Sequence, residues 1–524
     1  MMPETIALDE RRAPAALLLR GAAGCLLFAA GYILINYRNL VSAVLYRAAA
    51  HDIHSAAIAL GAFALQALAL LLLVALCPRR LAPVLLALVA LSAFVNICYA
   101  TIVRDTIDAA KLAWLFEESR QAGAASREFL PDLAISIART GAAVLLLAGA
   151  RHILAPLARG LRGGTRSGLF AVALLAPFFA GLNPLAGERN VYAYAAAILT
   201  APPPPARDAV PVAPAGTGIE KIVWLIDESV SRDAFEQIVR PEMDRFAPVD
   251  FGETASLGNC SGPSNLALRS GIDVRAIGPA TDLRRSPTIW GFARKAGYRT
   301  MLIDGQVTGA PQNMIIPTER VLIDDYLAAS HGIDTDRRIA RRVNAELRRK
   351  GRQFIYVVLR GVHFQYSDHY PAGTIPDDSP LALKYRTAVA WSKRDVFQLL
   401  LDGIDRERVA IVYTSDHGQD VRPDHPPHCN AAPRKAEFAI PLVALLPDKM
   451  AADLASRPAG GHSASQIFPT TLGWMGYPAE WAARHYDNDL GAAAQAYVWL
   501  GRSALPTGPG TTIEVHRPGG FPGS

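Results

Sequence analysis

Five long apolar stretches in the first third of the chain constrain its fold more than any other feature. A helix that crosses a membrane needs about 20 consecutive, mostly apolar residues. The stretches cover residues 15–35, 58–76, 81–103, 133–154 and 169–185, and the fourth is the weakest because Arg139 and Arg151 interrupt it. The alternative is a set of buried helices in a large soluble core, but five such lengths in succession fit a soluble core poorly. The sequence therefore predicts a transmembrane domain of five helices in residues 1–190.

Basic residues near the ends of these stretches predict their orientation. Cytoplasmic loops carry an excess of Lys and Arg. The residues that give this signal are Arg11, Arg12, Arg79, Arg80, Arg159, Arg162 and Arg166. With the N-terminus in the cytoplasm and five spans, the rest of the chain lies on the other side of the membrane. Basic and aromatic residues do not gather on one face, so nucleic acid is not an expected partner.

The remainder of the chain has the composition of a globular domain. A Pro-rich stretch, 191–218, contains four consecutive prolines at 202–205 and is expected to be a semi-rigid linker. After it, strand-like apolar runs at 222–226, 300–303, 354–359, 409–413 and 440–446 alternate with helix-like segments at 288–295, 337–349 and 381–401. This alternation predicts an α/β domain with a mostly parallel sheet flanked by helices, over residues 219–506. The Gly- and Pro-rich residues 507–524 are expected to form a flexible tail.

Side chains that bind metals follow several of these strands. Asp416 and His417 come just after the run at 409–413, and Glu228 comes just after the run at 222–226. Because the carboxyl ends of parallel strands share one edge of a sheet, where ligands bind, these groups are expected to meet there. Carboxylate and imidazole groups are good ligands for a divalent metal. An acid after a strand is also common for solubility, so each motif alone is weak.

A hydroxyl group and two further imidazoles complete the pattern. Ser261 stands where a helix is expected to begin, and His363 and His428 lie in polar segments after the middle strand and after Asp416. A hydroxyl at a helix N-terminus beside a metal ionises more readily and could attack phosphorus, although an ordinary helix cap is the simpler explanation of Ser261 alone. His369, His425 and His462 are expected to be surface or structural residues.

Together these motifs resemble the alkaline phosphatase and sulfatase superfamily. The order is an acid after the first strand, a hydroxyl at a helix start, a His after a middle strand, and Ser-Asp-His-Gly followed by His. Five spans before such a domain resemble the phosphoethanolamine transferases that modify lipid A and related glycans. The run at 227–232, Asp-Glu-Ser-Val-Ser-Arg, is similar to their Gly-Glu-Thr-Ala-Arg motif, and residues 466–473 resemble a late helix of the superfamily.

The resemblance implies roles for individual residues. A zinc ion would be held by the nucleophile and three other residues, Glu228, Asp416 and His417. His363, His428 and Asn265 would contact the transferred phosphate or a second zinc ion. Two alignments with the family motifs select either Ser261 or Ser264 as the nucleophile. Ser261 is favoured because Pro263 then falls in the first helical turn.

Departures from the family patterns are informative. Asn265 replaces the sulfatase arginine, and neither serine lies in the sequence needed to make formylglycine, which argues against a sulfatase. The transferases' local disulfide cannot form, because no second cysteine follows Cys260 nearby. Cys260 and Cys429 both adjoin site residues and are predicted to pair across the site. The other cysteines, Cys25, Cys77 and Cys98, lie within or at the ends of spans as small apolar residues.

The resemblance implies an enzyme of the bacterial inner (cytoplasmic) membrane with a periplasmic catalytic domain. It would move phosphoethanolamine, or a similar phospho-head group, from a phospholipid donor such as phosphatidylethanolamine to a lipid A, glycan or related acceptor, through a covalent serine intermediate. A phosphodiesterase or phosphatase with the same metal site is the first alternative. A catalytically inactive membrane sensor or scaffold is the second.

Overall fold

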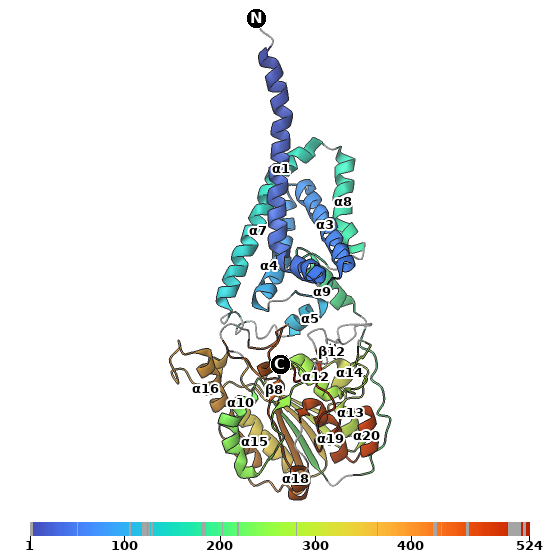
Figure 1. Cartoon of the computed structure of the whole chain (residues 1–524), viewed down its shortest axis with the longest axis vertical. Helices are drawn as coiled ribbons and strands as arrows, with labels where there is room; N and C mark the ends of the chain where they lie inside the picture. Colours follow the sequence, from blue (N-terminus) through green and yellow to red (C-terminus); the bar gives the residue numbers. More distant parts are fainter. Residues whose placement is uncertain are drawn as a thin grey trace. The chain divides into compact units, whose positions relative to one another are not determined.

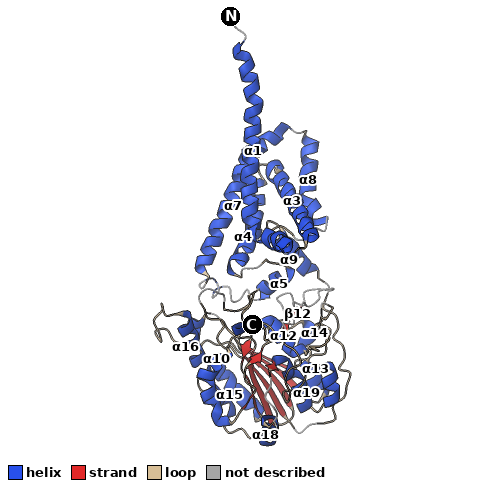
Figure 2. Cartoon of the chain, in the orientation of Figure 1, coloured by secondary structure: helices blue, strands red, loops and turns tan. Residues whose placement is uncertain are grey.

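The computed structural model divides the chain into two compact units, at residues 1–116 and 120–200, and at residues 117–119 and 201–524. It describes residues 4–49, 51–103, 106–117, 123, 126, 129–160, 162–179, 185–201, 203–216, 219–278, 280–363, 365–422, 427–430, 432–456, 461–500, 515–516 and 520–524. Figure 1 traces both units along the chain, and Figure 2 shows that helices form the first while strands occur only in the second.

The first unit is a helical bundle. Its helices are α1 (Glu4–Leu40), a π-helix (Val41–Leu45), α2 (Tyr46–Ala49), α3 (Ile53–Leu76), α4 (Ala82–Ile102), α5 (Ala109–Glu117), α7 (Leu130–Leu157), α8 (Gly163–Phe179) and α9 (Asn190–Thr200). Four segments are long and apolar enough to cross a membrane: Leu17–Leu45, Ile53–Leu76, Ala82–Ile102 and Leu130–Gly160. The first four predicted spans are therefore confirmed as helices of membrane-spanning length.

The fifth predicted span, 169–185, is not confirmed. It overlaps α8, which has 17 residues, and it continues into residues 180–184, outside the described part of the chain. The expected linker also begins differently, because α9 occupies residues 191–200. This part of the chain is rich in alanine, the best helix former, and contains no proline.

Small residues bring α1 and α7 close together in the bundle. A Cβ atom on Gly31 would lie 3.1 Å from the carbonyl oxygen of Ala143, and one on Gly24 would lie 2.7 Å from Leu154. Such close approach of helix backbones is typical of membrane bundles. Because lipid is itself apolar, the hydrophobic effect does not drive these helices together, and small residues allow the close packing that does. Leucines such as Leu18 and Leu19 point outward, as expected for helix faces that meet lipid.

The second unit is built on a seven-stranded sheet in the order β2-β9-β7-β1-β6-β4-β5. Its strands are β1 (Lys221–Asp227), β2 (Val249–Asp250), β4 (Arg299–Asp304), β5 (Asp325–Ala328), β6 (Gln353–Val358), β7 (Val409–Ser415) and β9 (Leu442–Leu445). The five neighbours β7, β1, β6, β4 and β5 run parallel, whereas β9 is antiparallel to both β7 and β2. The predicted mostly parallel sheet is confirmed.

Smaller elements complete this unit. The remaining strands are β3 (Thr254–Ala255), β8 (Ala439–Ile440), β10 (His462–Ser463), β11 (Trp499–Leu500) and β12 (Val515–His516). The helices are α10 (Arg232–Ala234), α11 (Arg240–Met243), α12 (Ser261–Ser270), α13 (Ile289–Lys295), α14 (Pro317–Arg320), α15 (Thr335–Leu347), α16 (Leu381–Lys393), α17 (Val396–Leu401), α18 (Asp448–Ala455), α19 (Ile467–Trp474) and α20 (Ala479–His485).

Alternate residues of the central strands enter two different cores. Val223 and Leu225 of β1 belong to one apolar cluster, with residues of α15, α16 and α17. Trp224 points to the opposite face, where its indole N–H donates a hydrogen bond to Thr471 Oγ1 of α19 at 2.8 Å and its ring packs edge-on against Phe354. Helices therefore cover both faces of the sheet, which explains why its strands read as continuous apolar runs (Figure 2).

Two predicted elements are divided in the structure. The strand expected at 440–446 is split at Pro441 into β8 and β9, which belong to different sheets, because proline has no N–H to continue a ladder. The helix expected at 381–401 is split into α16 and α17 at Asp395, whose φ of +63° is incompatible with a continuous helix.

The segments on either side of the globular domain contact it. In the expected linker, the Asp208 N–H donates to the Arg285 carbonyl at 2.7 Å, and the Ala215 N–H donates to the Gly476 carbonyl at 2.8 Å. The linker residues 203–216 thus lie against the domain and do not form a free spacer. Most of the expected tail, 507–524, falls outside the described residues, but within the part that is described β12 pairs with β11.

Candidate metal centre and nucleophile

Glu228 follows β1 at the carboxyl edge of the sheet. Its neighbour Ser229 has a φ of +62°, so the chain turns sharply as it leaves the strand. Gly361 passes so close that a Cβ atom there would lie 2.5 Å from the Glu228 carbonyl oxygen, and its φ of +55° also favours glycine. The Glu228 side chain is fully buried and therefore needs polar partners.

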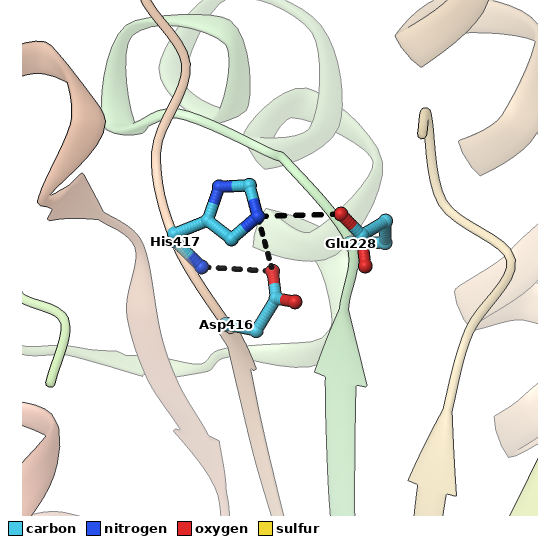
Figure 3. Close-up of side chains that lie close together, drawn as sticks. All are labelled: Glu228, Asp416 and His417. Carbon is cyan, nitrogen blue, oxygen red and sulfur yellow. Dashed lines mark hydrogen bonds and ion pairs between the residues drawn. The ribbon is translucent and has the colours of Figure 1, made fainter. Parts of the chain in front are cut away.

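Asp416 and His417 follow β7, the neighbour of β1, and both are buried. The imidazole Nδ1 of His417 lies 2.8 Å from the Gly418 carbonyl oxygen, to which it can only donate. Its Nε2 faces the two carboxylates and lies 3.4 Å from Glu228 Oε1 and 3.9 Å from Asp416 Oδ1. Figure 3 shows the three side chains converging from the ends of the two strands.

Ser261 is the first residue of α12, directly after the residue that caps the helix, Cys260. Its hydroxyl donates to Glu228 Oε2 at 3.0 Å and lies 3.3 Å from His417 Nε2. Ser264, one turn later, is fully buried, and its hydroxyl donates to the Asp416 carbonyl oxygen. Ser261 is therefore the serine whose oxygen reaches the cluster, whereas Ser264 holds the loop that carries Asp416.

A disulfide joins the start of α12 to the loop after Asp416. Cys260 and Cys429 are bonded, with their Cα atoms 4.9 Å apart. This is the pairing expected from the sequence. It fixes the residue before Ser261 to the residue after His428, and the Cys429 N–H also donates to the Asn259 carbonyl at 2.8 Å.

The residues of the cluster fit a divalent metal ion. One ligand atom from each of Glu228, Asp416 and His417 lies within 4.8 Å of the others. Asp416 Oδ2 is buried and has no hydrogen-bond partner among the described residues, although such an atom is costly unless something binds it. A cation among these groups would supply that partner, and the carboxylate–imidazole donor set suits zinc.

The electrostatics of the cluster also indicate a missing positive charge. Burial, together with the negative charge of Glu228, raises the pKa of Asp416 to about 8. Burial alone would lower the pKa of His417, but the charges of Asp416 and Glu228 raise it to about 9. The protein thus lacks internal cations sufficient for two buried carboxylates, and a bound metal ion would provide the compensating charge.

His363 and His428 lie beside the cluster as half-buried rings. The ring of His428 stacks on that of His417 with centroids 4.7 Å apart, and the ring of His363 lies 6.0 Å from His428. Burial and these neighbouring rings hold the pKa of His428 well below its usual value, so its ring is neutral. Among the described residues, the only three-residue metal group is Glu228, Asp416 and His417, and it does not include these two rings.

The other predicted residues lie elsewhere. Asn265 is buried, donates to the Ser261 carbonyl at 2.9 Å and accepts from the Tyr356 hydroxyl at 2.7 Å, so it is better placed to hold α12 than to contact a substrate. His369 is buried and donates to the His363 carbonyl at 2.6 Å. His462 Nδ1 lies 3.0 Å from Gln466 Oε1, and His425 is outside the described residues.

Gln306 and a buried lysine network, neither of them predicted from the sequence, also support the site. Gln306, just after β4, donates from its amide to Glu228 Oε2 at 2.5 Å, and its position at a strand end was a usable signal. Lys393 Nζ lies 2.6 Å from Asp227 Oδ1 and 2.8 Å from Asp336 Oδ2, and all three side chains are buried. Asp336 also accepts hydrogen bonds from the backbone N–H groups of residues 360 and 361, so this network supports the loop that precedes His363.

Comparisons with known proteins agree with this architecture. Residues 267–477 match the family model Sulfatase, a range that contains His363, Asp416, His417 and His428 and begins just after Ser261. This part of the chain is therefore similar to the sulfatase family. No curated protein matches the chain.

Two solved structures are similar to the chain. The integral membrane protein lipooligosaccharide phosphoethanolamine transferase A (EptA) from Neisseria meningitidis is 14% identical, with a TM-score of 0.54, over 87% of this chain and 96% of that one. The C-terminal periplasmic domain of EcEptC from Escherichia coli is 18% identical, with a TM-score of 0.48, over 60% of this chain and 98% of that one. The likeness to EptA supports the same fold over both units, a helical bundle followed by an α/β domain.

Proposed function

We propose that the sulfatase-family domain of this chain is the catalytic part of a membrane-anchored, zinc-dependent phosphoethanolamine transferase. The observation that carries the proposal is the position of the Ser261 hydroxyl, which lies 3.0 Å from Glu228 and 3.3 Å from His417 within a buried metal-binding group. A nucleophile that is also beside a metal ligand set is suited to phosphoryl transfer through a covalent intermediate. The helices of membrane-spanning length would keep such a site near a lipid donor.

The reaction would proceed in two displacements. Ser261 Oγ forms a bond to the phosphorus of a phosphatidylethanolamine head group while the bond from phosphorus to the glycerol oxygen breaks. The serine hydroxyl gives up its proton, for which Glu228 is already the hydrogen-bond acceptor, and the glycerol oxygen takes up a proton as diacylglycerol leaves. A hydroxyl or phosphate oxygen of a lipid A or other glycan acceptor then attacks the same phosphorus, and Ser261 is regenerated.

The residues around Ser261 divide the remaining tasks. Zinc bound by Glu228, Asp416 and His417 would lower the pKa of the serine hydroxyl and stabilise charge on the phosphate oxygens. The rings of His363 and His428 border the same space and would donate hydrogen bonds to those oxygens. The buried side of α12, tied through Ser264 and the disulfide, keeps Ser261 in place. We propose that the site faces the bacterial periplasm from the inner membrane, as the resemblance to the phosphoethanolamine transferases implies.

Mass spectrometry of the full chain isolated from bacterial membranes tests the proposal. We expect a phosphoethanolamine adduct on the peptide that contains both serines. Ser261→Ala should remove the adduct, and Ser264→Ala, the matched control on the same helix, should keep it at reduced yield. An adduct on Ser264 would overturn the choice of nucleophile, and an adduct of another mass would overturn the donor.

A second measurement separates a transferase from a hydrolase. The purified chain with stoichiometric zinc is incubated with a soluble phosphodiester, with and without an acceptor. We expect slow turnover without the acceptor, because the covalent intermediate waits for it. Fast multiple turnover into water alone would instead identify a phosphodiesterase that uses the same site.

A further inference from the structure

The two arginines that interrupt α7 have different environments. Arg151 is used by the bundle itself: its guanidinium donates to the carbonyl oxygens of Val74 and Cys77, each at 2.8 Å, and so caps the end of α3. Within the described part of the chain, Arg139 forms no hydrogen bond or ion pair. An arginine in a helix of membrane-spanning length is costly to insert, and such a residue is a functional candidate when no structural partner explains it.

Arg139 lines a cavity of about 360 Å³ between α1, α4 and α7. The other polar groups that line it include Arg38 and Asn39 of α1 and Asn96 of α4, together with the hydroxyl-bearing Tyr37 and Thr101. Aliphatic side chains such as Leu34 and Ile97 form the rest of its wall. Its volume falls in the usual range of small-molecule sites, about 300–1,000 Å³. Two arginines and two amides beside an aliphatic wall match a ligand with one anionic group and one apolar part.

The amide side of this cavity is held rigidly. Asn96 donates to the Gly187 carbonyl at 3.0 Å and exchanges two hydrogen bonds with the Asn190 side chain, at 2.7 and 2.8 Å. A Cβ atom on Gly187 would lie 3.2 Å from Asn96 and 3.4 Å from the Asn39 amide nitrogen. The non-helical segment around Gly187 is thus packed against the amides that line the cavity, and the site is pre-organised before any ligand arrives.

We propose that this cavity binds the phosphodiester group of a membrane phospholipid, held by the guanidinium groups of Arg38 and Arg139. Arginine presents several N–H donors in a planar arrangement that matches phosphate oxygens, and basic pockets between transmembrane helices bind lipid head groups in this way. A phospholipid, and not a soluble phosphate, is the expected occupant because the cavity lies among helices of membrane-spanning length and has an aliphatic wall.

The position of Arg139 along its span agrees with a lipid phosphate. The segment Leu130–Gly160 has 31 residues, which at about 1.5 Å each rise about 46 Å, more than the hydrocarbon core of about 30 Å. Arg139 comes nine residues after Leu130, about 14 Å along the helix. This places it close to one face of the core, where a long side chain reaches the lipid phosphates.

Native mass spectrometry of the full chain in detergent micelles tests the site. Phosphatidylethanolamine and a diacylglycerol with the same acyl chains are titrated separately, and the retained lipid is counted. We expect wild type to retain the phospholipid and not the diacylglycerol. Arg139→Gln and Arg38→Gln should each weaken retention at least about tenfold, as expected for the loss of a charge-assisted hydrogen bond. Arg139→Lys should keep most of it.

The control is Arg159→Gln, which removes an exposed arginine at the far end of the same span and should bind like wild type. Zinc content and size-exclusion profile check that each variant is folded. Equal retention by Arg139→Gln and wild type would overturn the site, and displacement of the lipid by millimolar inorganic phosphate would overturn the choice of a phospholipid. Binding is read without any reaction at Ser261, so this test and that of the proposed function can fail separately.

Discussion

Asp227 and Glu228 are adjacent in the sequence and both fully buried, yet they meet opposite environments. Asp227 Oδ1 lies 2.6 Å from Lys393 Nζ, and its Oδ2 accepts a hydrogen bond from the Tyr413 hydroxyl at 2.6 Å. Within the described residues, the only ion pair of Glu228 is with His417. The protein supplies a lysine to the first carboxylate, whereas the second meets, as its ion-pair partner, only an imidazole that it shares with Asp416.

This difference separates a structural acid from a metal ligand. A buried carboxylate must be neutralised by a proton, by a cation of the protein or by a bound ion. The Asp227 site is complete, because Lys393 bridges it to Asp336. Around Glu228, the pKa of Asp416 is raised by burial and by Glu228 itself, and one oxygen of Asp416 has no hydrogen-bond partner in the part of the chain that the structure describes. The incomplete site is therefore the one that requires a ligand.

Replacement of Glu228, the acid of the metal-binding group, should have the largest effect. Glu228→Gln removes one charge and one ligand, so we expect loss of stoichiometric zinc and a fall in adduct formation of about a thousandfold, equivalent to several kcal/mol of transition-state stabilisation. Metal analysis and the rate of adduct formation measure both.

The matched control is Glu220→Gln, which makes the same change just before the other end of β1. Its carboxylate is partly exposed and pairs with Arg408. We expect zinc content and rate to stay at wild-type levels. Full zinc occupancy in Glu228→Gln would show that Glu228 is not a zinc ligand.

Replacement of Lys393 should have the next largest effect, and it should lower the stability of the fold more than the zinc content. Lys393→Met leaves Asp227 and Asp336 buried together without a counter-charge, which costs about 3–5 kcal/mol when one partner of a buried ion pair is lost. Hydrogen exchange of the β1 and β6 amides in the full chain measures this cost. Lys384→Met, a less buried lysine of the same helix, should change little. A variant as stable as wild type would mean that Lys393 does not neutralise the pair.

The sheet and the edge that carries the site were predictable from the sequence because both depend on local patterns. Continuous apolar runs mark β1, β4, β6 and β7, and polar residues after them mark one edge. The division of the run at 440–446 also had a visible signal, Pro441. Nothing local distinguishes Lys393 from an exposed helical lysine, because its burial depends on Asp227 and Asp336, which lie 166 and 57 residues away in the sequence.

Loss of the disulfide between the two sides of the site should destabilise the protein less than loss of Lys393. Replacement of both Cys260 and Cys429 by alanine opens a disulfide between residues 169 positions apart. We expect a loss of about 2–4 kcal/mol in the same hydrogen-exchange measurement, in the amides of α12 and the loop after Asp416. Cys25→Ala, which removes a free and exposed cysteine, is the control. Unchanged exchange in α12 would show that the hydrogen bonds of Ser264 and Asn265 suffice to hold Ser261.

The smallest expected effect concerns the second partner of Asp227. Tyr413→Phe removes one hydrogen bond of 2.6 Å to Asp227 Oδ2 and should cost about 1.5–3 kcal/mol, the range for a hydrogen bond to a charged group, without loss of zinc.

The Lys393→Met/Tyr413→Phe double variant makes the test specific. If both groups act on the charge of Asp227, their effects cannot be independent: without the lysine, Asp227 becomes protonated, and the tyrosine then stabilises a neutral acid. The double variant should therefore lose less stability than the sum of the single variants, by about 0.5–3 kcal/mol. Additive losses would mean that Tyr413 and Lys393 stabilise the fold separately, and that the contrast between Asp227 and Glu228 is one of packing and not of charge.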